Sequence, residues 1–408
     1  MADSKRAGFK ELAKKASMQP QEALLEINKS NKSLHIGVPK EITYEEKRVA
    51  LTPSSVQLLV SNGHEVTLET KAGEAAHFTD SEYSEAGAKI AYSVTDVYKS
   101  DIIVKVDPPT EEEIRLMRPE QLIFSAIQQT TLRDTYIKCL MQKKVTAVAF
   151  EYMRDDAFTI PIVRSMSEIA GTTSILIASE YLSSANGGKG EMLGGVTGIP
   201  PSEVVIIGAG TVGEFAAMAA LGLGASVKVF DKSTNKLRRL QTNVGARVST
   251  SLLHPKILEK ALHNADVAVG ALRSDDGRSP SVVTEQMVIK MKAGSVIIDV
   301  SIDQGGCFET SELTNHTNPI FTKHDVIHYC VPNIPSRVAR TASYALSNIL
   351  TPVLLGIADE GGFQNYIWDK AGLRNGVYIY KGNLTNRNIG QRLHIPDKDI
   401  DLLIAAHL

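Results

Sequence analysis

The sequence predicts an α/β protein with two doubly wound α/β domains joined by long helices. Short apolar segments alternate with helical ones from residue 34 to about 152, and a second such series runs from 203 to 331. Two long helical segments, 165–188 and 340–359, flank the second series. Strands that alternate with helices form mostly parallel sheets, and the two long helices can connect two such sheets.

Length, charge and cysteine content exclude several classes of protein. The 408 residues exceed one ordinary domain, and the net charge of −2 provides no basic surface for nucleic acid or anionic lipid. The three cysteines are widely separated, which argues against a disulfide framework or a zinc site. No apolar run approaches the ~20 residues of a transmembrane helix, and residues 1–33 lack the apolar core of a signal peptide. We therefore expect a cytoplasmic protein without a metal, a nucleic-acid partner or a membrane partner, and a helical arm over residues 1–33.

The first α/β series begins with a strand at 34–41 and a helix at 52–63. Thr52 is expected to be the N-cap of this helix, with Pro53 in its first turn and Gly63 at its end. The series continues with the strand 64–70, the helix–glycine–strand segment 81–91 and the strands 101–106, 121–127 and 145–152.

Strand 101–106 carries charged residues where it ends. Because successive side chains of a strand alternate between its faces, Ile103, Lys105 and Asp107 share one side. Two interpretations remain open from this pattern. Lys105 and Asp107 form an internal ion pair at a sheet edge, or the end of the strand opens onto a functional site.

The second series contains a nucleotide-binding pattern. Gly208, Gly210 and Gly213 have the GxGxxG spacing between an apolar strand and an apolar helix, and Asp231 ends the next strand. The glycines allow a tight turn and close approach of a pyrophosphate, which the helix N-terminus attracts. Asp231 can bind both ribose hydroxyls and would repel a 2′-phosphate. We therefore predict a Rossmann domain that binds NAD, although Lys236 and a neighbouring lysine weaken the preference over NADP.

Later strands follow at 265–272, 294–303 and 326–331, and four polar residues deserve separate assessment. Asp303 follows a buried strand and precedes two glycines, where it can meet the nicotinamide or substrate; an Asx-turn is the alternative. Asn333 is a hydrogen-bonding candidate in a second loop, or part of a proline-rigidified turn. Arg48 can hold a carboxylate or lie in solvent. We expect His328 to be a core residue, and the last forty residues to be helix and loop.

Several segments together resemble the alanine dehydrogenase/transhydrogenase α-subunit family, more closely its alanine dehydrogenases. The matching segments are IGVPKE…KRVALTP, GHEV, MSEIAG, GGVTGIPPSEVVIIGAGTVG, DVSIDQGGCFE and YCVPNIPSRVARTASYAL, and the resemblance runs from about residue 34 to at least 360. It implies a substrate domain formed by 34–161 and 340–408, with the Rossmann NAD domain, 162–339, inserted between them. It also implies a homo-oligomer, either a hexamer or a dimer.

The resemblance implies a reaction and residues that perform it. Alanine dehydrogenases transfer a hydride from Cα of L-alanine to NAD, and the imine is hydrolysed to pyruvate and ammonia. Arg48 matches the arginine that holds the carboxylate, and Asp303 matches the carboxylate that assists water, ammonia and the imine. We therefore expect Asp303 and Gln128 as catalytic residues and Arg48, Lys105 and Asp107 as substrate-binding residues. The expected NAD contacts are Ser167, Gly208, Gly210, Thr211, Val212, Gly213, Asp231, Lys236, Leu272, Val300, Ile302 and Asn333.

Two positions depart from the alanine dehydrogenase pattern. The chain has Asp107 where that pattern has a lysine, and Gln128, or Gln129 with a one-residue shift, where it has a histidine. An anion ~4 Å from another is unfavourable by roughly 4 kcal/mol at an effective dielectric of 20. Glutamine cannot exchange protons near neutral pH. Three functions thus stay open: an NAD-dependent dehydrogenase of alanine or a related amino acid, a transhydrogenase-like hydride carrier, and a catalytically silent NAD-binding protein.

Overall fold

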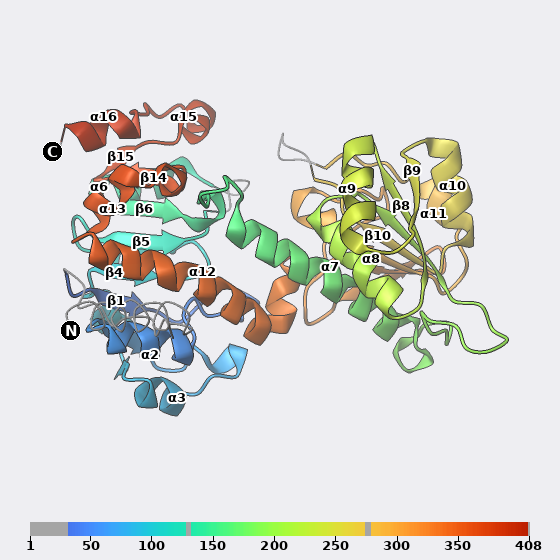
Figure 1. The fold of residues 1–408 in the computed structure, drawn as a ribbon, viewed down its shortest axis with the longest axis horizontal. Coiled ribbons are helices and arrows are strands. Elements are labelled where there is room, and N and C mark those ends of the chain that lie inside the picture. The colour runs from blue at the N-terminus through green and yellow to red at the C-terminus, as the bar shows by residue number, and fades with distance from the viewer. Residues whose placement is uncertain (1–31, 128–131, 274–278, 407–408) are drawn as a thin grey trace, which may run out of the picture.

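The computed structural model describes residues 32–127, 132–273 and 279–406, and it contains two separate α/β sheets (Figure 1). Nearly all of the expected arm 1–33 lies outside the described residues, as do Gln128 and Gln129. The prediction of two mostly parallel α/β sheets in two domains is confirmed. The boundaries 34–161, 162–339 and 340–408 stay a prediction.

The first sheet has eight strands in the order β15-β14-β6-β5-β4-β1-β2-β3. Strands β1 to β6 pair in parallel, whereas β14 is antiparallel to both β6 and β15. The bounds are β1 His35–Val38, β2 Glu65–Glu69, β3 Lys89–Ala91, β4 Ile102–Val104, β5 Leu122–Ser125, β6 Thr146–Ala149, β14 Val377–Tyr380 and β15 Asn383–Leu384.

The C-terminal segment differs from its sequence prediction. Residues 369–408 were expected to be helix and loop, yet they contribute β14 and β15 to the edge of the first sheet. The sequence VYIY of β14 is apolar and fully buried, but it has only four residues. So short an apolar run does not distinguish strand from helix until a partner strand is known.

The second sheet has seven strands in the order β12-β13-β11-β10-β7-β8-β9, with only β12 antiparallel. The bounds are β7 Glu203–Ile207, β8 Ser226–Asp231, β9 Ser249–Leu252, β10 Val267–Gly270, β11 Val296–Asp299, β12 Ile320–Lys323 and β13 Val326–Tyr329. The four central strands are apolar and buried almost throughout, as expected for a parallel sheet covered on both faces.

Helices cover both sheets, and most begin with recognisable signals. Thr52 is the N-cap of α2 and Pro53 its first residue, as predicted. Thr79 and Thr110 begin α3 and α5 with complete capping boxes. The α-helices are α2 Pro53–Ser61, α3 Asp80–Glu85, α4 Val94–Val97, α5 Glu111–Leu116, α6 Asp134–Gln142, α7 Pro161–Leu182, α8 Thr211–Gly222, α9 Thr234–Val244, α10 Pro255–Asn264, α11 Glu285–Ile289, α12 Ala339–Asp359, α13 Phe363–Asp369, α14 Ala371–Arg374, α15 Arg387–Leu393 and α16 Ile400–Ala405.

Helix α7 leads from the first sheet to the second, and α12 leads back across the first sheet, so the two helices connect the sheets (Figure 1). Helix α7 packs closely on α8. The two helices approach so closely at Gly171 that a Cβ there would collide with the carbonyl oxygen of Val212. Within the described residues, the segment Ile334–Asp359 is long and apolar enough to cross a membrane, but half of its most apolar window is buried inside the protein. Its inner face, including Leu346, Leu350 and Leu354, belongs to the core of the first sheet. We therefore interpret it as a core helix.

Candidate functional site

The turn between β7 and α8 has the geometry of a phosphate-binding turn. Gly208 has φ 119°, in a region that disfavours other residues, and a Cβ at Gly213 would collide with the carbonyl oxygen of Gly208. At Gly210, by contrast, a Cβ would meet no described atom within 4 Å, so the turn is open on that side. Thr211 and Val212 begin α8, and no described side chain caps this helix. Its first amides thus point at the position that a pyrophosphate occupies in Rossmann domains.

Asp231 ends β8 beside this turn and is almost fully buried. One carboxylate oxygen accepts the amide of Ala209 at 2.8 Å, and the other accepts the amide of Ser233 at 2.8 Å. The carboxylate therefore fixes the glycine turn and the start of α9, and each oxygen keeps a lone pair for a ribose hydroxyl. Lys236 lies in the first turn of α9 with its side chain exposed.

The loops after β10 and β11 meet at the same edge of the second sheet. The carbonyl of Leu272 accepts the Ser301 hydroxyl at 2.8 Å, and the amide of Ala271 donates to Ile207 of β7 at 2.8 Å. Val300 and Ile302 belong to the 3-10 turn η5 Val300–Gln304, which follows β11 directly. The structure therefore gathers these expected cofactor residues next to Gly208, where the nicotinamide half of a dinucleotide would lie.

A second cluster joins the two sheets around Arg48. Glu46 holds the guanidinium through Nε at 2.8 Å and Nη2 at 2.6 Å, and it also accepts the backbone amide of Arg48. From the other domain, the Asn333 side-chain amide donates to the same carboxylate at 2.9 Å. Asn333 itself is in the left-handed region, with φ 54°, at the start of η6 Ile334–Val338. Glu46 therefore connects an expected substrate-binding residue with an expected cofactor-binding residue.

This arrangement specifies how Arg48 can bind a ligand. A guanidinium presents one edge through Nε and Nη2 and another through Nη1 and Nη2. Glu46 occupies the first edge, and Nη1 contacts the Met166 sulfur at 3.4 Å. A substrate carboxylate would therefore meet the second edge. Ser167 follows Met166 on α7, close to the same cluster.

Asp303 lies in η5, where the charge of Arg48 from the first domain acts on it. Its side chain is reached by solvent, yet surrounding protein atoms desolvate it enough to raise the pKa of Asp303 to about 6. The backbone amide of Asn333 and the charge of Arg48 act against this rise in pKa, and nearby Asp299 adds to it. Asp303 is therefore a carboxyl group able to exchange a proton near neutral pH.

Lys105 is completely buried and has two glutamate partners in the first domain, Glu113 on α5 and Glu41 in the loop after β1. Its Nζ lies 3.0 Å from Glu113 Oε1 and 3.5 Å from Glu41 Oε2. Glu41 also accepts the amides of Val106 and Asp107, at 2.6 and 3.3 Å. The first interpretation of this strand end was an ion pair between Lys105 and Asp107. In the structure Lys105 does form ion pairs, and its partners are Glu113 and Glu41.

Asp107 is buried next to this ion pair, 6% exposed. Burial raises the pKa of Asp107, against a hydrogen bond from Thr43; Glu46 also raises it, while Lys105 and Arg48 lower it. The charges of Asp107 and Arg48 thus act on one another, which places the end of β4 at the Arg48 cluster. Gln128, the remaining expected catalytic residue, lies outside the described residues.

Four acidic residues of these clusters were missed by our sequence reasoning: Glu41, Glu46, Glu113 and Asp299. Each lies close in sequence to a residue that we did select, but their roles depend on contacts between segments. Only the spacing E-x-R of Glu46 and Arg48 offered a local signal. His328 is a core residue, as predicted: its two nitrogens contact Thr310 and the Val326 carbonyl, and burial lowers its pKa to about 4.

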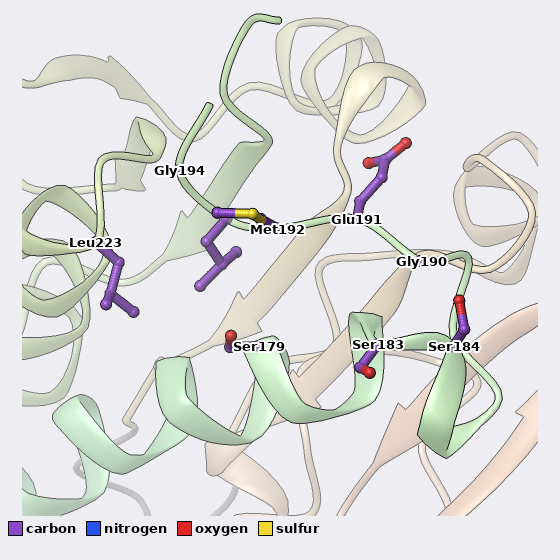
Figure 2. Close-up of a pocket in the computed structure, with 9 residues that line it drawn as sticks. Ser179, Ser183, Ser184, Gly190, Glu191, Met192, Gly194 and Leu223 are labelled. Atoms are coloured by element: carbon purple, nitrogen blue, oxygen red, sulfur yellow. The ribbon is translucent and has the colours of Figure 1, made fainter. Parts of the chain in front are cut away.

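One cavity lies away from the glycine turn and the Arg48 cluster, and none of the residues described above lines it. It measures about 440 Å³ and is bordered by the end of α7, the segment 190–194 and Leu223. Figure 2 shows that serine hydroxyls and apolar side chains line it, with Glu191 at its rim. Within the described parts of the chain, no group of three or more His, Cys, Asp and Glu residues could hold a metal ion.

Comparison with known proteins agrees with this geometry. The family model described as alanine dehydrogenase/PNT, C-terminal domain, matches residues 174–387, and the corresponding N-terminal model matches residues 37–170. The chain belongs to the alanine dehydrogenase/PNT family. The C-terminal domain of this family binds NAD(H), and the glycine turn and Asp231 lie in the part of the chain that matches this domain.

Individual relatives cover almost the whole chain. Alanine dehydrogenase 2 of Staphylococcus aureus (strain USA300) and alanine dehydrogenase of Staphylococcus epidermidis (strain ATCC 12228) are each 37% identical over 369 residues, 90% of this chain and 99% of theirs. A solved L-alanine dehydrogenase, 38% identical, superimposes with a TM-score of 0.82 over 87% of this chain and 98% of its own. A transhydrogenase from Sinorhizobium meliloti, 22% identical, has a TM-score of 0.75 over 86% of this chain and 99% of its own and shares the fold.

Proposed function

We propose that the protein catalyses the NAD-dependent oxidative deamination of L-alanine or a related amino acid to the 2-oxo acid and ammonia. The observation that carries this proposal is that the Arg48 cluster of the first domain reaches the loops of the second: Asn333 donates to Glu46, which holds Arg48, and the charge of Arg48 acts on Asp303. NAD, when bound, accepts the hydride from Cα of the amino acid. The substrate carboxylate must also be bound and a proton exchanged with water and the amine, and we assign these two tasks to side chains.

Arg48 would hold the substrate carboxylate through its Nη1–Nη2 edge, while Glu46 keeps the guanidinium in place. Asp303 would accept a proton as water attacks the imine carbon, and return it to the departing amine. Its pKa of about 6 suits this exchange, because both protonation states are populated near neutral pH. Overall, the amino acid, NAD⁺ and water yield the oxo acid, ammonium, NADH and a proton.

A catalytically silent NAD-binding protein is the second candidate, and the charge at Asp107 favours it. Around Arg48 and Lys105 the described chain places the carboxylates Glu41, Glu46, Asp107 and Glu113. The carboxylate of an amino acid or oxo acid would be repelled by this excess of negative charge. Binding is then weaker than with a lysine in place of Asp107.

The test is NADH formation from NAD⁺ with a panel of L-amino acids, followed by ultraviolet absorbance, in the wild type and in the double variant Asp107→Lys/Gln128→His. We expect turnover of at least one amino acid by the wild type, abolished by Asp303→Asn while NADH still binds. Turnover of alanine only by the double variant would indicate that these two sites alone were lost. Tight NADH binding with no turnover by either protein refutes the proposal in favour of the silent protein.

We further propose that the protein is a cytoplasmic homo-oligomer, a hexamer or dimer, without nucleic-acid or membrane partners. The support is the membership of the alanine dehydrogenase/PNT family and the burial of the one long apolar helix of the described residues. Light scattering of the purified protein measures its assembly.

A further inference from the structure

We propose that Asp299 is a positioning residue that holds the loop carrying Asp303 in its active shape. This inference rests on the proposed function of Asp303. Asp299 is the last residue of β11, it is fully buried, and it lies four residues before Asp303. It touches neither Arg48 nor Asn333 through any contact that the structure describes, so its effect on substrate would pass through the loop.

The carboxylate of Asp299 collects donors from both ends of the loop. One oxygen accepts the amide of Ser301 at 3.1 Å, before Asp303. The other accepts the amide of Cys307 at 2.9 Å, that of Phe308 at 3.4 Å and the hydroxyl of Ser311 at 2.7 Å, all after it. The loop therefore leaves β11 and returns to the same side chain.

Two glycines make room for this side chain. A Cβ at Gly270, on the neighbouring strand β10, would lie 2.7 Å from one carboxylate oxygen of Asp299 and 2.5 Å from the Cys307 sulfur. A Cβ at Gly306, which has φ 79°, would lie 2.7 Å from the other oxygen. The GG of the IDQGG sequence is thus explained in part by the space that the buried carboxylate needs.

No described lysine, arginine or histidine forms an ion pair with Asp299. Burial raises the pKa of Asp299, and the hydrogen bonds from the Ser311 hydroxyl and the three backbone amides oppose that rise by stabilising its charge. A side chain that needs several amides at once fixes the backbone that supplies them. Between these anchoring points, the amides of Gly305 and Gly306 close turns onto the carbonyls of Ile302 and Ser301. Asp303 is held at the top of this closed loop.

The charge of Asp299 acts on the pKa of Asp303, and a shift of that pKa is a readout that a purely structural aspartate would not give. It is one of the groups that raise the pKa of Asp303, and the charged neighbour that acts in the opposite direction is Arg48. The other titratable groups that Asp299 influences are the thiols of Cys307 and Cys330, whose pKa values burial raises. Removal of the charge should therefore lower the pKa of Asp303.

The decisive variant is Asp299→Asn, compared with Asp266→Asn. Asp266 is likewise a buried aspartate of the second domain, but it lies at the opposite end of β10, where it contacts Lys189 and Lys292. For Asp299→Asn we expect kcat to fall by about tenfold to a hundredfold, because a displacement near 1 Å has effects of this size. NADH affinity should be retained, and the acid limb of the kcat profile should move to lower pH. Asp266→Asn should lower stability without moving that limb.

Ser311→Ala is the second variant in case Asp299→Asn does not fold, since it removes one donor and leaves the carboxylate. It should lower kcat less and preserve KM and NADH binding. A wild-type pH profile and kcat in Asp299→Asn, or in Ser311→Ala if only that variant folds, overturns the inference. If the wild type turns over no amino acid, the proposed function fails. Carbon-13 NMR titration of labelled aspartates, assigned with Asp303→Asn, then tests the positioning directly: an unchanged Asp303 titration in the variant overturns it.

Discussion

Replacing Glu41 with glutamine tests how this buried carboxyl group, near the end of β4, changes the free energy of unfolding with pH. The Glu41 side chain is 5% exposed and lies 3.5 Å from Lys105 Nζ. Burial raises the pKa of Glu41 to about 7 from 4.5, against the attraction of Lys105 and the hydrogen bond from Val106, and Glu46 and Asp107 add to the rise. Glutamine keeps an oxygen for the Val106 amide but carries no charge.

The sign and size of the effect follow from proton linkage. Between pH 4.5 and 7 the folded protein keeps a proton on Glu41 that the unfolded chain releases. The free energy of unfolding therefore falls as pH rises through this window. About 2.5 pKa units at 1.36 kcal/mol each correspond to a loss on the order of 3 kcal/mol. Glu41→Gln lacks this loss, so its stability relative to wild type should increase by that order between pH 5 and 8.

The assay is denaturant unfolding at a series of pH values, with tryptophan fluorescence and circular dichroism compared to test for a single transition. Glu259→Gln is the control. Glu259 is an exposed carboxylate whose pKa its partner Lys290, at 2.5 Å, lowers, so its replacement should have a small effect of the opposite sign. A stability difference between Glu41→Gln and wild type that stays constant from pH 5 to 8 refutes the reasoning.

Two further substitutions test the ligand contacts. Arg48→Lys keeps a positive charge but loses the planar guanidinium that binds Glu46 and a substrate carboxylate at the same time. We expect KM for the amino acid to rise about tenfold to a hundredfold, with the affinity for NADH unchanged. Steady-state kinetics and NADH fluorescence titration measure these two quantities, and an unchanged KM contradicts the prediction. Asp231→Ala removes the carboxylate that accepts the Ala209 and Ser233 amides and that is expected to bind the ribose. We expect the dissociation constant for NADH to rise about tenfold or more. Equal NADH affinity in variant and wild type would show that the carboxylate only holds the glycine turn.

The glycine turn and the carboxylate beside it could be predicted from sequence because their geometry is local. Gly208, Gly213 and Asp231 belong to one strand–turn–helix–strand unit, and the constraints on the turn appear as glycines at fixed spacing. The Arg48 cluster is different, because Glu46 contacts Asn333, which lies 287 positions further along the chain. No periodicity encodes such a contact. The strands β14 and β15 were missed for the same reason, since the pairing of β14 with β6 and of β15 with β14 is set by the fold and not by their own short sequences.

Lys105 cannot replace the lysine that is missing at position 107. The two positions are only two residues apart, and on sequence alone Lys105 could have supplied the positive charge to the substrate. In the structure its ammonium group is completely buried, 3.0 Å from Glu113 and 3.5 Å from Glu41. Withdrawing it to meet a substrate would leave the Glu113 carboxylate buried without its cation, which is unfavourable by roughly 3–5 kcal/mol. In the proposed mechanism the positive charge for a substrate carboxylate is therefore supplied by Arg48, and the strength of the Arg48–Glu46 pair would set how readily that charge is shared.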